Sequence, residues 1–551
     1  MSFQSPSSTC CTFIPGLGTL DGLQYETSVQ QFCGIPYAHL PKRWTRSTLK
    51  TAWKGEHHDG THLGNDCPSP KIDGDDSDDL VPVPPAAHFP NPPDVDELSA
   101  LVMNIVIPCA INPNTTNNAP LPVLVYVHGG SLLYGGANLP IFDAVNLVSH
   151  SITIGQPIIV VNFNYRVGIG GFLAGSAIAR ELARDGFAGS GNFGFTDQQV
   201  AFEWVQRYIP FLGGDAHNVT AVGESAGGIS ISNQLLAANP PDFNRAVCMS
   251  GLSASIPAWT MKQHDRFFGD VCRHFGIDPA SPEALDTLRA VPQQELANAT
   301  PLIQGVPSGT GNPCLDGWFY GNSDPRDIHA PPGWLEGLTL GDTYHEGVIF
   351  HINLLQEDYE SIRRTLQTYI ENEVYTDQIL DDYGIDKDLS HEGLLLRVQH
   401  MCGDAIFKIP NYVLAQKYLS KNVLNGSTLF MYHFDQRSRI PNAFEGTAYH
   451  AHELLYLFGN LDNAFNEDER RMAREFASAW IRFVNGLEPW DASEKKWMVW
   501  GPNSSVKLTS EEEDDIVRHY SRMKKVLNLG SGEIWKKWLA GVDALVNHRQ
   551  Y

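Results

Sequence analysis

Short runs of apolar residues, separated by polar and glycine-rich segments, recur along this chain. Six of these runs are rich in β-branched and aromatic residues and have the length of buried strands. Helical spacing is found between several of them, as at Val200, Trp204 and Tyr208, where Thr196–Gln199 fits a capping box. Near-continuous apolar strands that alternate with helices predict a mostly parallel α/β sheet. The six predicted strands are 101–107, 122–127, 157–163, 219–222, 245–249 and 428–434.

The segments outside these strands have other patterns. Residues 16–44 are interrupted by glycine and proline and partly alternate, which predicts short antiparallel strands at a sheet edge. Residues 68–97 contain five aspartates between 73 and 79 and many prolines, so we expect a long loop. Residues 255–335 and 350–425 are more helical and less regular. We interpret the three segments 68–97, 255–335 and 350–425 as insertions that form a cap and a pocket wall.

The most informative motif follows the strand predicted at 219–222. Gly223–Gly227 reads G-x-S-x-G and precedes a helix predicted over 229–238, which is the arrangement of a nucleophile elbow. Side chains at the glycine positions would collide with the neighbouring strand and helix, so the turn holds Ser225 in a strained conformation. The free N–H groups and the positive end of the helix dipole point to the same place. The motif alone is weak in a chain with 49 glycines, but this context makes Ser225 a candidate nucleophile.

The composition is that of a globular protein with a large core, since 42% of the 551 residues are hydrophobic and 10% are aromatic. The formal net charge of −24 disfavours a nucleic-acid partner, because phosphate binding requires a basic surface. No apolar run reaches the roughly 18 residues of a transmembrane helix. The first residues lack a charged segment followed by a long apolar stretch, so we expect no secretory signal and a cytoplasmic location.

Nine cysteines are scattered along the chain without a C-x-x-C pair, and no histidine cluster has metal-binding spacing. This pattern predicts reduced thiols, as in a cytoplasmic protein, and no metal site. The aspartates at 73–79 resemble a calcium-binding loop only superficially, because the distal glutamate of that pattern is missing.

Several further motifs occur together in one known protein family. Because it contains these motifs, the chain resembles the type-B carboxylesterase/lipase family, the cholinesterase-like branch of the α/β-hydrolases. The resemblance extends from about residue 16 to the Gly486–Pro489 region. It implies an α/β-hydrolase fold in one domain, residues 1–551, with a large, mostly parallel central sheet flanked by helices, cap-forming insertions and no cofactor. The motifs are Phe32–Ala38, Asn164–Gly168, Gly191–Gln198, Gly213–Asp215 and Gly223–Gly228.

The resemblance also implies a catalytic triad in the chain order serine, acid, histidine. The family's acid motif corresponds to Gly341–Gly347, which places the acid at Glu346. The family's catalytic histidine precedes a glutamate by three residues, which selects His450 and not His452. Asp342 is the alternative acid. In this assignment Ser225 attacks, His450 takes its proton, and Glu346 holds the imidazole tautomer and stabilises the imidazolium.

Backbone donors for a tetrahedral intermediate are expected at two places. The N–H of Ala226 follows the nucleophile, as this fold requires. In the family, two glycines after a histidine supply the other N–H groups, and here these positions are Gly130 and Ser131. A serine keeps the N–H but must accept the same dihedral angles. Residues expected in the pocket or behind the triad are Gly129, Glu224 and Ser250.

These residues predict a serine hydrolase that cleaves a small-molecule carboxylic ester through an acyl-enzyme, with water as the second nucleophile. An acyl transferase or cyclase that acts on a specialised biosynthetic substrate is an alternative, because an internal hydroxyl or amine can capture the acyl group. A non-catalytic binding or adhesion relative is a further alternative, although such relatives usually lack a triad member. The identity of the ester and the oligomeric state stay open.

The loop after Cys67 is expected to lack a cross-link that is common in secreted relatives. The position of the second cysteine in those relatives falls within 98–101, where this chain has none. Cys109 lies beyond the predicted strand, too far from the loop base for a disulfide. We therefore expect Cys67 to be a free thiol and residues 70–95 to form a mobile rim of the active-site entrance.

Overall fold

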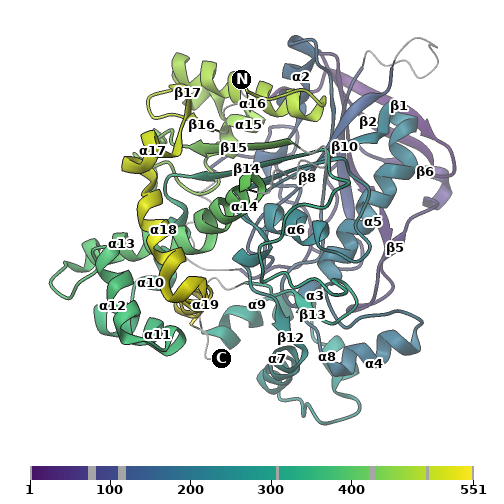
Figure 1. The fold of residues 1–551 in the computed structure, drawn as a ribbon. Helices are drawn as coiled ribbons and strands as arrows, with labels where there is room; N and C mark the ends of the chain where they lie inside the picture. The colour runs from purple at the N-terminus through teal and green to yellow at the C-terminus, as the bar shows by residue number, and fades with distance from the viewer. Residues whose placement is uncertain are drawn as a thin grey trace.

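A sheet of thirteen strands organises the computed structural model, which describes residues 3–71, 82–109, 119–305, 310–420, 428–491 and 496–548. Seven adjacent strands, from β9 to β16 in the sheet order, are parallel, and antiparallel strands continue the sheet on both sides (Figure 1). In sheet order, the strands are β1 (Ser8–Ile14), β2 (Gly18–Tyr25), β3 (Val29–Pro36), β7 (Val102–Pro108), β9 (Ile159–Phe163), β8 (Leu121–Val127), β10 (Gly214–Glu224), β11 (Arg245–Met249), β14 (Gly337–Thr343), β15 (Thr428–Phe434), β16 (Trp497–Trp500) and β17 (Val506–Thr509), with β6 (His57–Asp59) beside β2.

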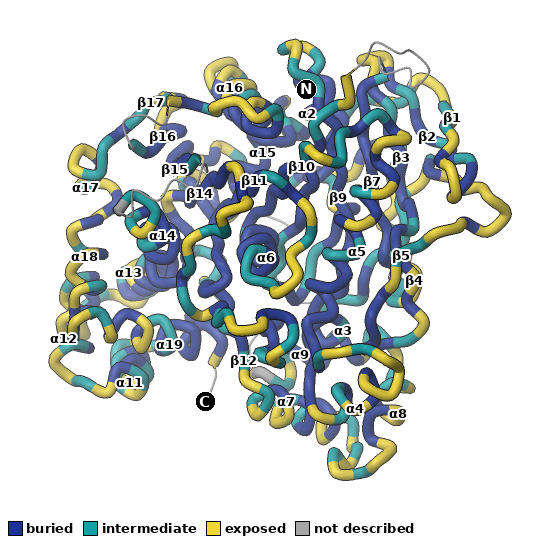
Figure 2. The backbone as a smooth tube through the Cα atoms, turned by 45° about the vertical axis from the view of Figure 1, so that its right-hand side comes forward, coloured by how far each residue is buried: buried dark blue, intermediate teal, exposed yellow. Residues whose placement is uncertain are grey.

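All six strands predicted from apolar runs are confirmed, and the antiparallel strands expected near the N-terminus are β2 and β3. The central strands are buried along most of their length because helices cover both faces of the sheet (Figure 2). Helices α5 (Phe193–Tyr208) and α6 (Ala226–Leu235) pack on one face. Helices α2 (Val145–Thr153), α15 (Glu453–Phe458) and α16 (Glu467–Val484) cover the other. The fold is that of an α/β-hydrolase.

The predicted capping box at Thr196–Gln199 is wrong. Helix α5 already begins at Phe193, after Asn192 in a left-handed conformation. The residues of the expected cap face the interior: Asp197 is fully buried and accepts hydrogen bonds from Arg166 Nε and Nη2, both at 2.7 Å. The Thr196 hydroxyl, which the pattern placed in the cap, donates to the carbonyl oxygen of Phe193 within the helix and caps no backbone N–H group of the described helix.

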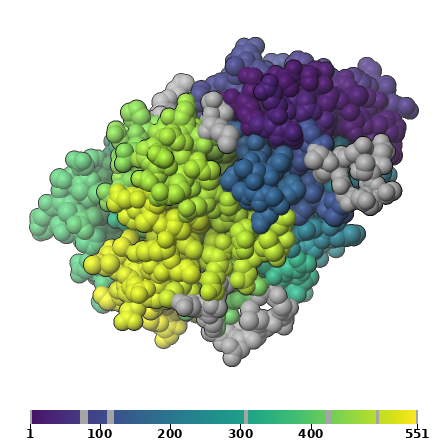
Figure 3. Space-filling view, turned by 90° about the horizontal axis from the view of Figure 1, so that it is seen from above, coloured from purple at the N-terminus to yellow at the C-terminus, as the bar shows by residue number. Residues whose placement is uncertain are grey.

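The two long insertions contain helices and, among the described residues, add no strand to the central sheet. The first insertion lies at the bottom of Figure 1 and the second at its left. The helix α19 (Ile534–Asn547), near the C-terminus, packs against α11 of the second insertion. Seen from above, the purple N-terminal part and the yellow-green C-terminal part form the two sides of the molecule (Figure 3). The helices are α7 (Met261–His274), α8 (Ala284–Arg289) and α9 (Gln293–Gln304), then α10 (His351–Leu354), α11 (Tyr359–Ile370), α12 (Glu373–Asp382), α13 (His391–Gly403), the π-helix η6 (Asp404–Lys408) and α14 (Ile409–Ser420).

Cys67 is a buried free thiol, as expected, and the other eight cysteines are also unbridged. The two ends of the loop that follows Cys67 meet at a parallel bridge between Asp66 and Val95. Asp73–Asp79 fall outside the described residues, and the mobility expected for 70–95 stays a prediction. No helix in the described part of the chain is both long enough and apolar enough to span a bilayer.

Candidate active site

Ser225 occupies the sharp turn between β10 and α6, with φ 55° and ψ −126°. A non-glycine residue in this conformation is strained, so the surrounding packing must hold it there. A Cβ on Gly223 would lie 2.4 Å from the backbone carbon of Gly227, and a Cβ on Gly227 would lie 2.0 Å from the carbonyl oxygen of Val127 on β8. Only glycine fits at both positions, as expected from the sequence.

Glu346 and His450 meet beside this turn although 104 residues separate them. Glu346 follows β14 and is 1% exposed, and its Oε2 lies 2.5 Å from His450 Nδ1. The other oxygen, Oε1, accepts hydrogen bonds from Ser250 Oγ at 2.7 Å and from the N–H of Thr343 at 2.6 Å. Ser250 thus holds the carboxylate toward the imidazole, which gives the serine a positioning role.

The second imidazole nitrogen faces Glu224. His450 Nε2 lies 3.1 Å from Glu224 Oε1, and both side chains are buried. No hydrogen bond joins this nitrogen to Ser225 Oγ in the described structure, although Ser225 directly follows Glu224 in the chain. The imidazole therefore lies between two carboxylates.

These neighbours determine the protonation of the site. Burial lowers the pKa of His450, but the negative charges of Glu224 and Glu346 outweigh this effect and raise the pKa to about 9. Burial raises the pKa of Glu224 to about 7, against the opposing effect of His450. The protonation states of this pair are thus linked, and the charge on Glu224 favours a protonated imidazole.

The turn after β8 contains two of the backbone N–H groups that the sequence analysis expects to act as donors. Gly129 lies against the nucleophile, because a Cβ at this position would come within 3.1 Å of Ser225 Cβ. Ser131 has φ 56°, so it does adopt the left-handed conformation that the Gly-to-Ser difference requires. The N–H groups of Gly130, Ser131 and Ala226 donate to no acceptor in the described part of the chain.

The alternative acid and the alternative histidine belong to other networks. Asp342 is buried with His433, whose Nδ1 lies 2.8 Å from Asp342 Oδ1, and with Arg518 at 3.6 Å. His452 packs against Tyr449 and its Nδ1 lies 3.0 Å from a main-chain oxygen, that of Gln436. Burial lowers the pKa of His452 to about 3, so it stays neutral.

Two neighbours of His450 were not predicted. Phe407 lies in the π-helix η6, and its ring centroid is 4.8 Å from that of the imidazole. Glu453 is fully buried, and burial together with the charges of Glu224 and Glu346 raises its pKa well above the usual range. The motif around His450 contained Glu453, but neither a π-helix nor a burial-shifted carboxyl leaves a periodic signal in the sequence.

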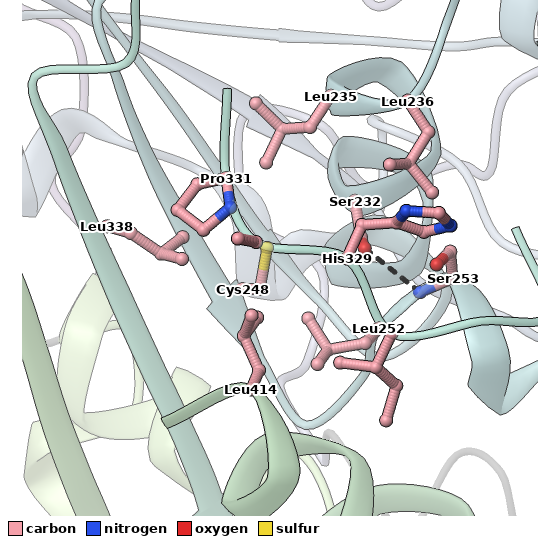
Figure 4. A pocket seen from close by; sticks show the side chains of 12 residues that line it. Ser232, Leu235, Leu236, Cys248, Leu252, Ser253, His329, Pro331, Leu338 and Leu414 are labelled. Atoms are coloured by element: carbon pink, nitrogen blue, oxygen red, sulfur yellow. Dashed lines mark hydrogen bonds between the residues drawn. The ribbon is translucent and has the colours of Figure 1, made fainter. Parts of the chain in front are cut away.

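No group of three potential ligands among histidine, cysteine, aspartate and glutamate comes together within the residues described. A small cavity of about 20 Å³ lies between the end of α6 and β11, near Cys248 and Leu338 (Figure 4). It has room for about one water molecule and contains none of the predicted site residues.

A strained serine between strand and helix, beside a buried Glu–His pair, defines this protein as an α/β-hydrolase of the serine type. The chain belongs to the carboxylesterase family, whose model matches residues 12–528. It is 30% identical to Lipase 3 of Yarrowia lipolytica over 84% of this chain and 86% of the relative. It is 27% identical to the para-nitrobenzyl esterase of Bacillus subtilis, over 84% and 88% of the two chains. A solved PNB esterase structure has the same fold, with a TM-score of 0.71, 24% identity and coverage of 93% and 99%. The protein is a carboxylic ester hydrolase.

Replacement of Glu224 by glutamine should move the acid limb of the kcat/KM profile to lower pH. A histidine acts as a base only when neutral, and loss of the Glu224 charge lowers the pKa of the His450 imidazole. The measurement is kcat/KM for a neutral ester between pH 5 and 10, with the exposed Glu203→Gln as the control. An unchanged limb, or a shift to higher pH, would contradict this electrostatic account.

Proposed function

We propose that Ser225, His450 and Glu346 form the catalytic triad that cleaves the ester. The observation that carries this assignment is the buried contact between Glu346 Oε2 and His450 Nδ1 beside the strained serine. With Nδ1 held by the carboxylate, Nε2 is the nitrogen available to act as a base. Asp342 pairs with His433, and His452 contacts the main chain of Gln436, so neither belongs to the pair of Glu346 and His450.

In the first half-reaction, His450 Nε2 takes the Ser225 hydroxyl proton while Oγ attacks the ester carbonyl. The imidazole turns from Glu224 toward Ser225 for this step. The N–H groups of Gly130, Ser131 and Ala226 stabilise the oxyanion, each with an effect of about 3 kcal/mol. His450 then protonates the departing alkoxide, and the acyl group stays on Ser225.

In the second half-reaction, a water molecule gives a proton to His450 and attacks the acyl-enzyme. The bond between the acyl carbon and Ser225 Oγ then breaks, His450 returns the proton to Oγ, and the acid is released. We propose hydrolysis of a small-molecule ester rather than acyl transfer. The relatives support this proposal, since they carry the names of lipases and of a para-nitrobenzyl esterase. We also propose a reducing compartment such as the cytoplasm, a location supported by nine unbridged cysteines.

A matched pair of acid variants tests the triad. Glu346→Gln should lower kcat by about 10³- to 10⁴-fold without unfolding, because the imidazole loses its tautomer control. Asp342→Asn should leave kcat within about threefold but reduce the free energy of unfolding by about 1–3 kcal/mol, since the buried His433 loses its nearest carboxylate while Arg518 keeps Asp435 and Asp514. Steady-state kinetics and denaturant unfolding measure both. Comparable losses of kcat in the two variants would mean that the acid is misassigned.

Product partition distinguishes hydrolysis from transfer. If water is the natural acceptor, an ester incubated with a moderate concentration of a competing primary alcohol should give the free acid as its main product. Chromatography of the acid and of the new ester measures the ratio. Predominant transfer to the alcohol would favour an acyl transferase, with the same triad.

A further inference from the structure

A cavity of about 710 Å³ lies apart from the proposed catalytic residues. Its floor consists of side chains from β3, β7 and β9, and the segment 137–144 closes one side. The proline-rich segment 82–93 closes the opposite side, with Phe89 among the lining residues. The volume is within the range of sites that bind drug-sized molecules. None of Ser225, Glu346 and His450 lines it, nor do Gly130, Ser131 or Ala226.

Two carboxylates line this cavity, and no lysine, arginine or histidine does so among the described lining residues. Asp66 accepts a hydrogen bond from Asn138 Nδ2 at 2.7 Å, and Asp143 accepts one from the N–H of Val145 at 2.9 Å. Neither carboxylate takes part in an ion pair with a described residue. Burial raises the pKa of Asp143 to about 6, so this group carries its charge at pH 7.5, and burial also raises the pKa of Asp66.

An amide side chain also lines the cavity. Asn162 on β9 is 5% exposed, and its Nδ2 donates to the carbonyl oxygens of Ala137 and Phe142, which holds the segment 137–144 against the sheet. Its Oδ1 is buried and has no hydrogen-bond partner among the described residues, so this wall of the cavity is polar.

We propose that this cavity binds an organic cation, an ammonium group carried on an apolar body. The ammonium group is attracted by the carboxylates of Asp66 and Asp143, which line the same cavity and have no cationic partner among the described residues. The rings of Phe89 and Phe142 cover the apolar body, and aromatic faces also attract cations. An anionic ligand is disfavoured, because it would add a third negative charge to two unpaired carboxylates.

Calorimetric titration of the full-length protein with 4-phenylbutylamine and with 4-phenyl-1-butanol at pH 7.5 tests this proposal. The two probes share the apolar body and differ in the cationic group. The amine should bind about tenfold more tightly than the alcohol, and added NaCl should weaken only the amine. Prior reaction of the active site with a fluorophosphonate should leave amine binding unchanged, because the cavity does not contain Ser225.

The isosteric variants Asp66→Asn and Asp143→Asn should each weaken amine binding, and together by about tenfold or more, without an effect on the alcohol. Asp242→Asn, which removes an exposed carboxylate elsewhere, is the matched control. The proposal is wrong if the amine and the alcohol bind equally, if the fluorophosphonate abolishes binding, or if the double variant keeps the wild-type affinity. If a variant fails to fold, the salt dependence of amine binding to the wild-type protein still tests the proposal.

Discussion

Close backbone packing between the Ser225 turn and strand β8 is the constraint on which the site depends. Gly227 approaches the carbonyl oxygen of Val127 so closely that no side chain fits between them. This contact brings the start of α6 against the end of β8. The turn that follows β8 therefore lies beside Ser225, and the free N–H groups of Gly130, Ser131 and Ala226 belong to two adjoining segments. The strain at Ser225 is maintained by this packing, because β10 is held between its parallel neighbours β8 and β11.

The second constraint is electrostatic. Three buried glutamates surround one buried histidine, and they cannot all carry a charge in so little solvent. Glu346 forms the closest contact with the imidazole, whereas burial raises the pKa of Glu224 to about 7 and that of Glu453 well above its usual range. The two carboxylates that contact His450 thus differ: Glu346 orients the imidazole, and Glu224 adjusts its basicity. The protonation of His450 is therefore linked to that of Glu224, which directly precedes Ser225 in the chain.

The sequence allowed prediction of those features that depend on local pattern. The strands are buried on both faces, so their apolar runs were visible, and the glycines around Ser225 follow from the turn itself. The start of α5 was not predictable from the Thr196–Gln199 pattern, because in the folded chain Thr196 lies inside the helix and Gln199 donates to the distant residues Gln234 and Asn239. Glu346 and His450 could be assigned only through the family resemblance, since nothing local links residues so far apart. The contacts of His450 with Glu224 and Phe407 required the tertiary structure.

The central claim is that Ser225 is the residue that becomes acylated. The most direct measurement is peptide mass mapping after the protein has reacted to completion with a fluorophosphonate, which adds a stable phosphonyl group to an activated serine. We predict a single adduct per chain, on the peptide that contains Ser225, formed at the rate at which esterase activity is lost. An adduct on another serine that accounts for the inactivation, or full esterase activity after complete modification of Ser225, would contradict the account.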